Sequence, residues 1–303
     1  MKKLVQVICV LLCSMMIGCS LPSVSKKDVK KYVIVKQLDH ASIDEIAVAI
    51  ENELKELDET AEVEIYSGQN DQSTLMQIGK QAVTDGADVI IPIGTLAAQT
   101  MVVASEDTEI PVVYATISDP EAASLTGIDR VTGTSDALNT KQFVEMMLKQ
   151  NPNLQTVGLL YSNSEANSQK PIAEVKKILD EKKIKYIEAT ANTSQEVIAA
   201  ASSLIASKVD AVFTPTDNVI MSSELAIYEA FINANIPHYA GADSFVRSGA
   251  YEVLQPGFKK TEEFITLDGG IITVNTEVAE KLGVNPDIFA DFGQVVTVET
   301  TGK

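Results

Sequence analysis

The sequence predicts an α/β protein of two Rossmann-like lobes, each a parallel sheet covered by helices, with a hinge between them. About 270 residues follow the N-terminal leader, a length at the limit of one hydrophobic core that favours two. Short apolar, β-branched runs alternate with stretches of helical periodicity, as in parallel α/β sheets. An internal repeat relates the first lobe to the second, so each lobe is expected to be one copy of the same unit.

The first 19 residues have the pattern of a bacterial lipoprotein signal. Lys2 and Lys3 precede an apolar run from Leu4 to Ile17 that is too short and wrongly flanked for a membrane span. Gly18-Cys19 then resembles a lipobox, with Met16 at the position where Leu is usual. We expect cleavage after residue 18, lipidation of Cys19 and a tether over residues 19–31; an uncleaved anchor is the alternative. Either reading places the protein on the extracytoplasmic face of the cell membrane.

The inventory of reactive side chains is small. The chain has three cysteines, Cys9, Cys13 and Cys19, and all belong to the leader or its end. Disulfides, a cysteine nucleophile and cysteine-based zinc sites are therefore excluded from the mature chain. Only His40 and His238 supply imidazole, and no Gly-rich phosphate motif follows the first strand. We expect no cofactor, no metal site and no enzymatic activity.

The net charge disfavours nucleic acid as a partner. The formal charge is −18, and it becomes −20 when Lys2 and Lys3 leave with the signal. An acidic surface of this kind repels phosphate backbones.

Three short segments recur at offsets of 122 to 126 residues. Val33–Gln37 matches Val157–Tyr161, Asp88–Thr95 matches Asp210–Asp217, and Ile110–Ala115 matches Ile236–Gly241. Each match alone is weak, but three at nearly one offset indicate duplication of a single unit. We place the N-terminal lobe at residues 32–153 and the C-terminal lobe at 154–265. Residues 266–303 are expected to be strands and a helix that return across the hinge.

The elements follow from periodicity. Buried parallel strands are expected at 89–91, 112–114, 157–160 and 211–213, where apolar and β-branched residues are consecutive. Helices are expected at 42–57, 73–84 and 194–206, where apolar residues recur every three or four positions. Ligands of open parallel sheets bind outside the carboxyl ends of the strands. The loops that follow the strands are therefore the candidate site.

These loops are rich in hydroxyls, amides and carboxylates. They span residues 38–40, 94–99, 116–120, 163–168, 215–218 and 241–244. Each precedes or opens a helix, so its polar side chains could cap that helix or hold an anionic ligand. Capping explains one polar side chain per loop. It explains less easily why six such loops lie at the same face of the two lobes.

Segments along most of the mature chain resemble the tryptophan/tyrosine-binding branch of the ABC transporter substrate-binding proteins, which have a type I periplasmic-binding-protein fold. The segments are Asn70–Thr74, Ala87–Gln99, Ile110–Pro120, Val131–Asp136, Tyr161–Ser168, Phe213–Asn218 and Ala279–Gly283. The resemblance implies a lipid-anchored receptor that captures a small solute between two lobes and delivers it to an ABC permease. It carries no catalytic residues.

One stretch departs from the family pattern. After Tyr251 the pattern expects a strand and a Gly-containing helix, but residues 252–264 lead quickly to Thr266–Gly270, where the resemblance resumes. We expect that a strand and most of a helix are lost or replaced here, which would affect closure of the cleft.

The predicted ligand is an aromatic amino acid such as tryptophan or tyrosine. Its carboxylate would be held by Thr95, Thr134, Ser135 or Ser168, and its ammonium by Asp217 or Asp119. The remaining candidate ligand-binding residues are Leu38, Thr116, Asn163, Glu165, Thr216, Asn218 and Asp243. Because the chain contains no Trp, stacking would come from a Tyr or Phe such as Tyr114 or Tyr161.

Other readings remain open. His40 lines the cleft or is a solvated loop residue, while His238 is expected to be a satisfied core residue. The alternative functions are binding or sensing of a sugar or nucleoside, or an enzyme on the same fold. A sugar site would be expected to carry more aromatic and paired Asp, Asn and Arg side chains, and the chain has only Arg130 and Arg247.

Overall fold

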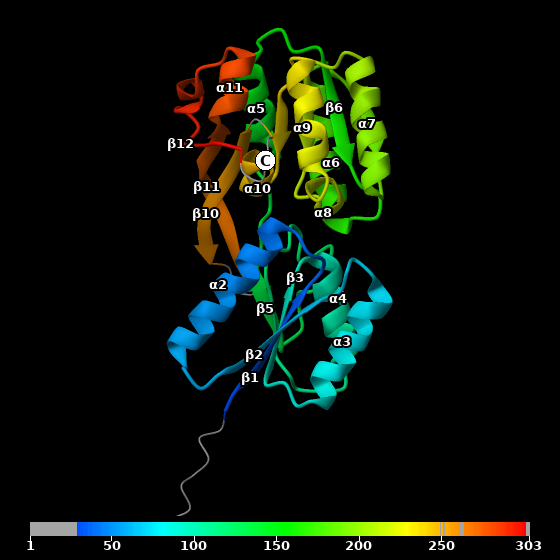
Figure 1. Cartoon of the computed structure of the whole chain (residues 1–303), viewed down its shortest axis with the longest axis vertical. Helices are drawn as coiled ribbons and strands as arrows, with labels where there is room; N and C mark the ends of the chain where they lie inside the picture. Colours follow the sequence, from blue (N-terminus) through cyan, green and yellow to red (C-terminus); the bar gives the residue numbers. More distant parts are fainter. Residues whose placement is uncertain (1–28, 249, 251, 261–263, 301–303) are drawn as a thin grey trace, which may run out of the picture.

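The structure is a computed structural model that describes residues 29–248, 250, 252–260 and 264–300, with backbone alone for 243, 252–260 and 264–270. It has two lobes stacked along the long axis of the molecule, the N-terminal lobe below the C-terminal lobe in Figure 1. The predicted signal, its Cys19 and most of the tether lie outside the described residues. Within the described part of the chain, no helix combines the length and apolar character needed to cross a bilayer.

The N-terminal lobe is a five-stranded parallel sheet with strand order β2-β1-β3-β4-β5. Its elements are β1 (Lys31–Lys36), α2 (Ala41–Leu57), β2 (Glu62–Ser67), α3 (Gln72–Thr84), β3 (Val89–Ile93), α4 (Thr95–Ala104), β4 (Val112–Tyr114) and β5 (Val131–Thr134).

The C-terminal lobe repeats this arrangement, with parallel strands in the order β7-β6-β8-β9. Its elements are α5 (Thr140–Gln150), β6 (Thr156–Tyr161), α6 (Ala166–Glu181), β7 (Lys185–Thr190), α7 (Ser194–Ala206), β8 (Ala211–Thr214), α8 (Asn218–Met221), α9 (Glu224–Asn233), β9 (His238–Ala240) and α10 (Asp243–Arg247). The α/β fold with parallel sheets is confirmed.

The repeat seen in the sequence has a structural counterpart. Asp88 accepts a hydrogen bond from the backbone N–H of Lys31 at the start of β1, at 2.8 Å. Asp210, 122 residues later, accepts one from the backbone N–H of Thr156 at the start of β6, also at 2.8 Å. An equivalent carboxylate, directly before β3 in the first lobe and before β8 in the second, therefore fixes the start of the first strand of each lobe.

Two long strands join the lobes, followed by the C-terminal elements. They are β10 (Glu252–Lys260) and β11 (Phe264–Asn275), which precede α11 (Thr276–Leu282), a 3₁₀ turn (Pro286–Phe289) and β12 (Gln294–Val298). β10 pairs with β9 of the C-terminal lobe and runs antiparallel to β11, while β11 pairs with β5 of the N-terminal lobe. The expected loss of a strand at 252–264 is therefore wrong, because residues 252–260 form β10. The boundary placed between residues 265 and 266 falls inside β11.

Side-chain caps fix where the helices begin. Asp71 and Thr193 accept hydrogen bonds from backbone N–H groups in the first turns of α3 and α7. His40 and Asp217 do the same for α2 and α8. Such caps satisfy N–H groups that have no partner inside the helix. Capping therefore accounts for part of the polar character of the loops after the strands.

The hydrophobic core is divided between the lobes. In the C-terminal lobe, Phe143 of α5 meets Phe213 of β8 edge to face, with ring centroids 5.4 Å apart. The N-terminal sheet is covered on one face around Tyr114 and on the other around Ile34. Each lobe is thus packed independently, so the lobes can change their relative orientation without disturbing either core.

Candidate functional site

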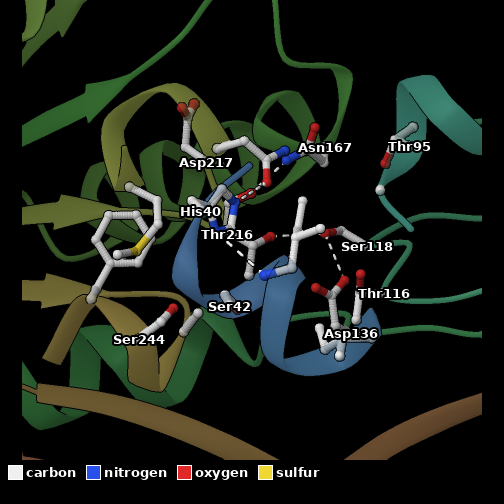
Figure 2. Close-up of a pocket in the computed structure, with 17 residues that line it drawn as sticks. His40, Ser42, Thr95, Thr116, Ser118, Asp136, Asn167, Thr216, Asp217 and Ser244 are labelled. Atoms are coloured by element: carbon white, nitrogen blue, oxygen red, sulfur yellow. Dashed lines mark hydrogen bonds between the residues drawn. The ribbon is translucent and has the colours of Figure 1, made fainter. Parts of the chain in front are cut away.

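A pocket lies between the lobes, at the carboxyl ends of the strands (Figure 2). About 480 Å³ of space at the pocket, part of it open to solvent, is not filled by protein atoms. Its walls come from both lobes: His40, Ser42, Ile43, Ile46, Gly94, Thr95, Thr116, Ser118 and Asp136 from the first, and Asn167, Thr216, Asp217, Asn218, Met221, Ala242, Ser244 and Phe245 from the second.

Four side chains form a network across the cleft. His40 Nε2 lies 3.0 Å from Asn218 Oδ1, Asn218 Nδ2 donates to Glu165 Oε2 at 2.7 Å, and Gln37 Nε2 donates to Glu165 Oε1 at 3.2 Å. Gln37 and His40 belong to the N-terminal lobe, and Glu165 and Asn218 to the C-terminal lobe. We call these four residues the cross-cleft network. Because its contacts exist only when the lobes meet, the structure is a closed form.

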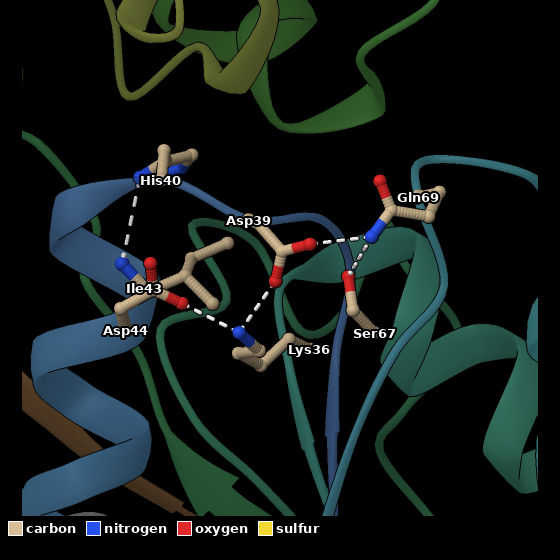
Figure 3. Close-up of polar contacts among 7 residues, drawn as sticks. All are labelled: Lys36, Asp39, His40, Ile43, Asp44, Ser67 and Gln69. Atoms are coloured by element: carbon tan, nitrogen blue, oxygen red, sulfur yellow. Dashed lines mark hydrogen bonds and ion pairs between the residues drawn. The ribbon is translucent and has the colours of Figure 1, made fainter.

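The loop that carries His40 is held by ion pairs (Figure 3). Lys36 Nζ contacts Asp39 Oδ1 at 2.5 Å and Asp44 Oδ1 at 2.6 Å, and Gln69 donates to Asp39 from the next loop. The hydrogen bond from Lys36 lowers the pKa of Asp39. The loop between β1 and α2 is therefore fixed on the N-terminal lobe, and His40 projects from it toward the cleft.

The hydrogen bonds of His40 define its tautomer. Nδ1 accepts from the backbone N–H of Ile43 at 3.4 Å, so the ring proton is on Nε2, which donates to Asn218. Burial lowers the pKa of His40, which favours this neutral form.

Glu165 supplies the carboxyl group of the cross-cleft network. It is only 2% exposed. Burial, and then the nearby charge of Asp217, raise the pKa of Glu165 to about 7. Glu165 therefore changes its charge near neutral pH, whereas an ordinary glutamate is fully ionised there.

A second contact between the lobes involves hydroxyls. Ser118 Oγ donates to Asp136 Oδ1 at 2.9 Å and lies 2.9 Å from Thr216 Oγ1 of the other lobe. Since Ser118 has one hydroxyl proton and gives it to Asp136, Thr216 is the donor in the second bond. Burial raises the pKa of Asp136. Ser118 is the only side chain, within the described residues, that bonds to this carboxyl group.

The two carboxylates expected to hold an ammonium already have partners in the protein. Asp217 Oδ2 accepts from Ser162 N at 2.7 Å and from Ser168 Oγ at 2.6 Å, and Oδ1 accepts from Ile220 N at 3.0 Å. Asp217 is 1% exposed, and burial raises its pKa. Asp119 forms an ion pair of 2.9 Å with Lys170 of the opposite lobe.

Two hydroxyls in the pocket are buried without a hydrogen-bond partner among the described residues. They are Thr95 Oγ1, at the first turn of α4, and Ser244 Oγ, at the start of α10. Thr95 is 5% exposed and Ser244 is 1% exposed. Buried polar atoms of native proteins are nearly always paired, so each unpaired hydroxyl indicates an absent partner.

The turn before Thr95 requires glycine. Gly94 has φ of +95°, and a Cβ atom there would lie 2.7 Å from Gln37 Oε1. That oxygen accepts from the backbone N–H of Leu96 at 3.0 Å, in the first turn of α4. The close approach of Gln37 thus fixes the start of α4 at the edge of the pocket.

The apolar part of the lining comes from both lobes: Ile43 and Ile46 of α2, and Met221 and Phe245 of the second lobe. Phe245 is the aromatic residue in the lining. Tyr114 and Tyr161, which the sequence suggested for stacking, belong instead to the two hydrophobic cores.

Of the candidate residues taken from the sequence, five line the pocket: Thr95, Thr116, Thr216, Asp217 and Asn218. Glu165 and Ser168 lie directly behind it, bonded to Asn218 and Asp217. Leu38, Thr134 and Ser135 pack or bond within the N-terminal lobe. Asn163 is exposed, and Asp243 begins α10, with its side chain outside the described set.

Sequence reasoning did not assign several lining residues to the site. Asp136, Ser118 and Asn167 occur in the segments that carry the family resemblance, so their position was a usable signal. Ile46 and Met221 gave no signal, because an apolar residue on a helix is normally a core residue. No group of three or more His, Cys, Asp or Glu side chains in the described chain could hold a metal ion.

His238 has the satisfied core position that the sequence suggested. It is 3% exposed, with Nδ1 3.0 Å from Glu224 Oε1 and Nε2 2.8 Å from Thr214 Oγ1. It also supports Phe245, whose ring centroid lies 6.2 Å away at an interplanar angle of 81°.

Comparisons with known proteins agree with this geometry. The chain is 30% identical to a tyrosine-binding protein of Clostridioides difficile, over 90% of this chain and 87% of that one. A solved structure from Streptococcus pneumoniae, described as an ABC domain in complex with L-Trp, has a TM-score of 0.77 and 26% identity over 88% of this chain and all of that one.

The ligand-free, open structure of a substrate-binding protein with adhesive properties from Clostridium difficile has a lower TM-score, 0.62, at 25% identity over 89% of this chain and all of that one. The chain therefore superposes better on the L-Trp complex than on this open structure. The family model described as ABC transporter substrate binding protein matches residues 31–262. The chain therefore belongs to the ABC transporter substrate binding proteins, a family of extracytoplasmic solute-binding proteins.

Proposed function

We propose that this protein binds an aromatic L-amino acid between its lobes and delivers it to an ABC permease, without catalysing a reaction. The observation that carries the proposal is the composition of the pocket. Hydroxyls of Thr95, Thr116 and Ser118 and the carboxyl group of Asp136 lie on one side of the pocket (Figure 2), and its lining also includes apolar side chains from both lobes. This arrangement suits a zwitterionic head group and an apolar side chain. The tyrosine-binding relative and the L-Trp complex support the same ligand class.

The start of α4 would hold the α-carboxylate. N–H groups in the first turn of a helix lack intrahelical partners and attract anions. Thr95 Oγ1 is buried beside them without a partner in the described chain. A ligand carboxylate would satisfy this hydroxyl and remove the cost of leaving it unpaired.

Asp136 is the best candidate for the ammonium. Asp217 already accepts three hydrogen bonds from the protein, and Asp119 pairs with Lys170. Asp136 accepts from one side chain, Ser118, and lines the pocket. Burial raises its pKa in the ligand-free site, and a bound ammonium would restore the ionised form. This choice replaces Asp217 and Asp119 as the first candidate.

Closure would couple binding to transport. Ser118 and Asp136 belong to the first lobe, while Met221 and Phe245 belong to the second. Only the closed form offers a ligand all of these contacts, so binding shifts the population toward it. A permease can then recognise the closed form.

Titration calorimetry of the purified protein with L-amino acids, sugars and nucleosides tests the ligand class. We expect saturable binding of aromatic amino acids, and a loss of about 2 to 5 kcal/mol on Asp136→Asn. Exposed Asp129 of the same lobe provides the matched control, Asp129→Asn, which should bind normally. Binding of a sugar or nucleoside with no amino acid would refute the proposal. Unchanged amino-acid binding by Asp136→Asn would return the ammonium to Asp217 or Asp119.

We also propose that the protein is anchored by lipid on Cys19. The motif of Gly18 and Cys19 after an apolar run supports this attachment. The acidic surface offers no alternative electrostatic anchor. Cys19→Ser should move the protein from the membrane fraction to the soluble fraction. Retention of Cys19→Ser in washed membranes would disprove lipidation as the anchor.

A further inference from the structure

We infer that Ser244 selects for a hydrogen-bonding group on the ring of the bound amino acid, so that tyrosine, and secondarily tryptophan, is preferred over phenylalanine. The inference rests on the proposed function and specifies its ligand.

The starting point is the distribution of unpaired buried atoms. Among the described residues, three buried side-chain atoms lack a hydrogen-bond partner: Thr95 Oγ1, Ser244 Oγ and Glu224 Oε2. The first two line the same pocket. An unpaired buried hydroxyl is costly, so two at one pocket indicate a ligand that satisfies both.

The two hydroxyls lie at different ends of the pocket. Figure 2 shows Thr95 near Ser118 and Thr116, while Ser244 lies on the opposite side. Two neighbours of Ser244 in the sequence, Ala242 and Phe245, also line the pocket. A ligand whose head group contacts Thr95 and Asp136 would therefore direct its side chain toward Ser244.

Ser244 is held where it is. Its carbonyl accepts from Ser248 N at 3.0 Å, within the turn that forms α10. The adjacent Phe245 is 1% exposed and packs against His238, which is fixed in turn by Glu224. The hydroxyl is therefore held at the pocket wall, where a bound ligand can supply its partner.

The chemistry of a serine hydroxyl determines which rings suit it. Its oxygen accepts a hydrogen bond from a phenol O–H or an indole N–H, and its O–H can also donate to a phenol oxygen. Phenylalanine offers neither group, so it would leave Ser244 buried and unpaired. A site that buries a polar group for a ligand hydroxyl discriminates strongly against the analogue that lacks it.

Calorimetry with L-tyrosine, L-phenylalanine and L-tryptophan on the wild type and Ser244→Ala tests this assignment. The wild type should bind tyrosine about tenfold to a hundredfold more tightly than phenylalanine, the range for one unpaired buried hydroxyl. Ser244→Ala should lose most of this preference, and its affinity for phenylalanine should stay the same or improve. Its melting temperature without ligand should not fall, because the change removes an unpaired group; a structural serine would lower it.

Ser222→Ala is the matched control. Ser222 directly follows the last residue of α8 and is exposed. Its hydroxyl donates to the carbonyl of Val219 at 2.8 Å. This variant should keep the tyrosine preference of the wild type. Equal wild-type affinities for tyrosine and phenylalanine, or a preference that survives Ser244→Ala, would overturn the role of Ser244 while leaving amino-acid binding intact. If no amino acid binds at all, the proposed function itself fails.

Discussion

Glu165→Gln should remove the contribution of Glu165 to the dependence of folding stability on pH. The pKa of Glu165 rises from 4.5 to about 7 in the folded protein. The folded state therefore retains a proton that the unfolded chain releases. The resulting stability is complete below about pH 4.5 and is lost as the pH rises through 7. At about 1.4 kcal/mol per pKa unit, the wild type should lose roughly 2 to 3 kcal/mol between pH 5 and pH 8.

The variant separates Glu165 from the other titrating member of the cross-cleft network. Burial lowers the pKa of His40, so its contribution has the opposite sign: it is present above pH 6.5 and is lost as the pH falls. His40 is common to both proteins, and its effect cancels in the difference between them. The glutamine also changes hydrogen bonding, but a neutral amide shifts stability by a similar amount at every pH.

Urea unfolding at half-unit intervals from pH 5 to pH 8 measures the effect. The free energies of unfolding of wild type and Glu165→Gln should converge or cross as the pH rises, with the difference changing by about 2 to 3 kcal/mol. Two parallel curves would refute the reasoning, since they would mean that Glu165 is already ionised throughout this range.

Three further changes test other contacts. Gly133→Ala would place a Cβ atom 2.0 Å from the Tyr114 carbonyl oxygen. This clash with the backbone should lower the free energy of unfolding, measured in urea, by more than about 3 kcal/mol. Near-native stability of the variant would contradict the packing of β4 against β5. Asp217→Ala removes the acceptor of three hydrogen bonds and should destabilise the fold by about 2 to 4 kcal/mol in the same assay; a loss below about 1 kcal/mol would contradict its capping role. Lys170→Ala breaks an exposed ion pair with Asp119, so the amino-acid affinity in calorimetry should change less than about fivefold; a larger change would show that this pair controls closure.

Much of the fold could be predicted because local patterns determine it. The helix expected at 194–206 is α7, and the strand expected at 112–114 is β4. Asp88 and Asp210, which the repeat places at equivalent positions, each accept a hydrogen bond from the backbone N–H at the start of the first strand of their lobe. In these places hydrophobic periodicity and the tertiary fold specify the same structure.

Residues 252–260 show why prediction failed elsewhere. Their sequence includes Pro256 and Gly257 inside what proves to be β10. The pairing of β10 with β11 shifts register between Pro256 and Phe258, and this irregularity accommodates residues that normally interrupt a strand. β10 pairs with β11, the next strand in the chain, and with β9 at Glu252, and these pairings rather than its own periodicity make it a strand.

The site was predicted less completely, because bonding across the cleft depends on how the lobes meet. Asp217 and Thr95 are both polar residues directly after a strand, and the sequence gives no means to tell their roles apart. In the structure Asp217 is saturated by internal donors, while Thr95 Oγ1 is unpaired within the described chain. The glutamate at 165 gave no indication that it would reach Gln37, 128 residues earlier.

The internal repeat shows how the two sides of the cleft differ chemically. The offset of 122 residues that relates Asp88 to Asp210 also relates Thr95 to Asp217, so the same position opens α4 in one lobe and precedes α8 in the other. In the second lobe the position carries its own negative charge, which binds the local N–H groups. In the first lobe the position is a neutral threonine. The N–H group equivalent to that of Ile220, at Ala98, bonds to the carbonyl of Gly94 at 3.0 Å, and Thr95 Oγ1 is unpaired within the described chain. A ligand carboxylate, as proposed above, would be favoured beside Thr95 and disfavoured beside Asp217, so this acid-for-hydroxyl difference would contribute to a single orientation of the ligand in the cleft.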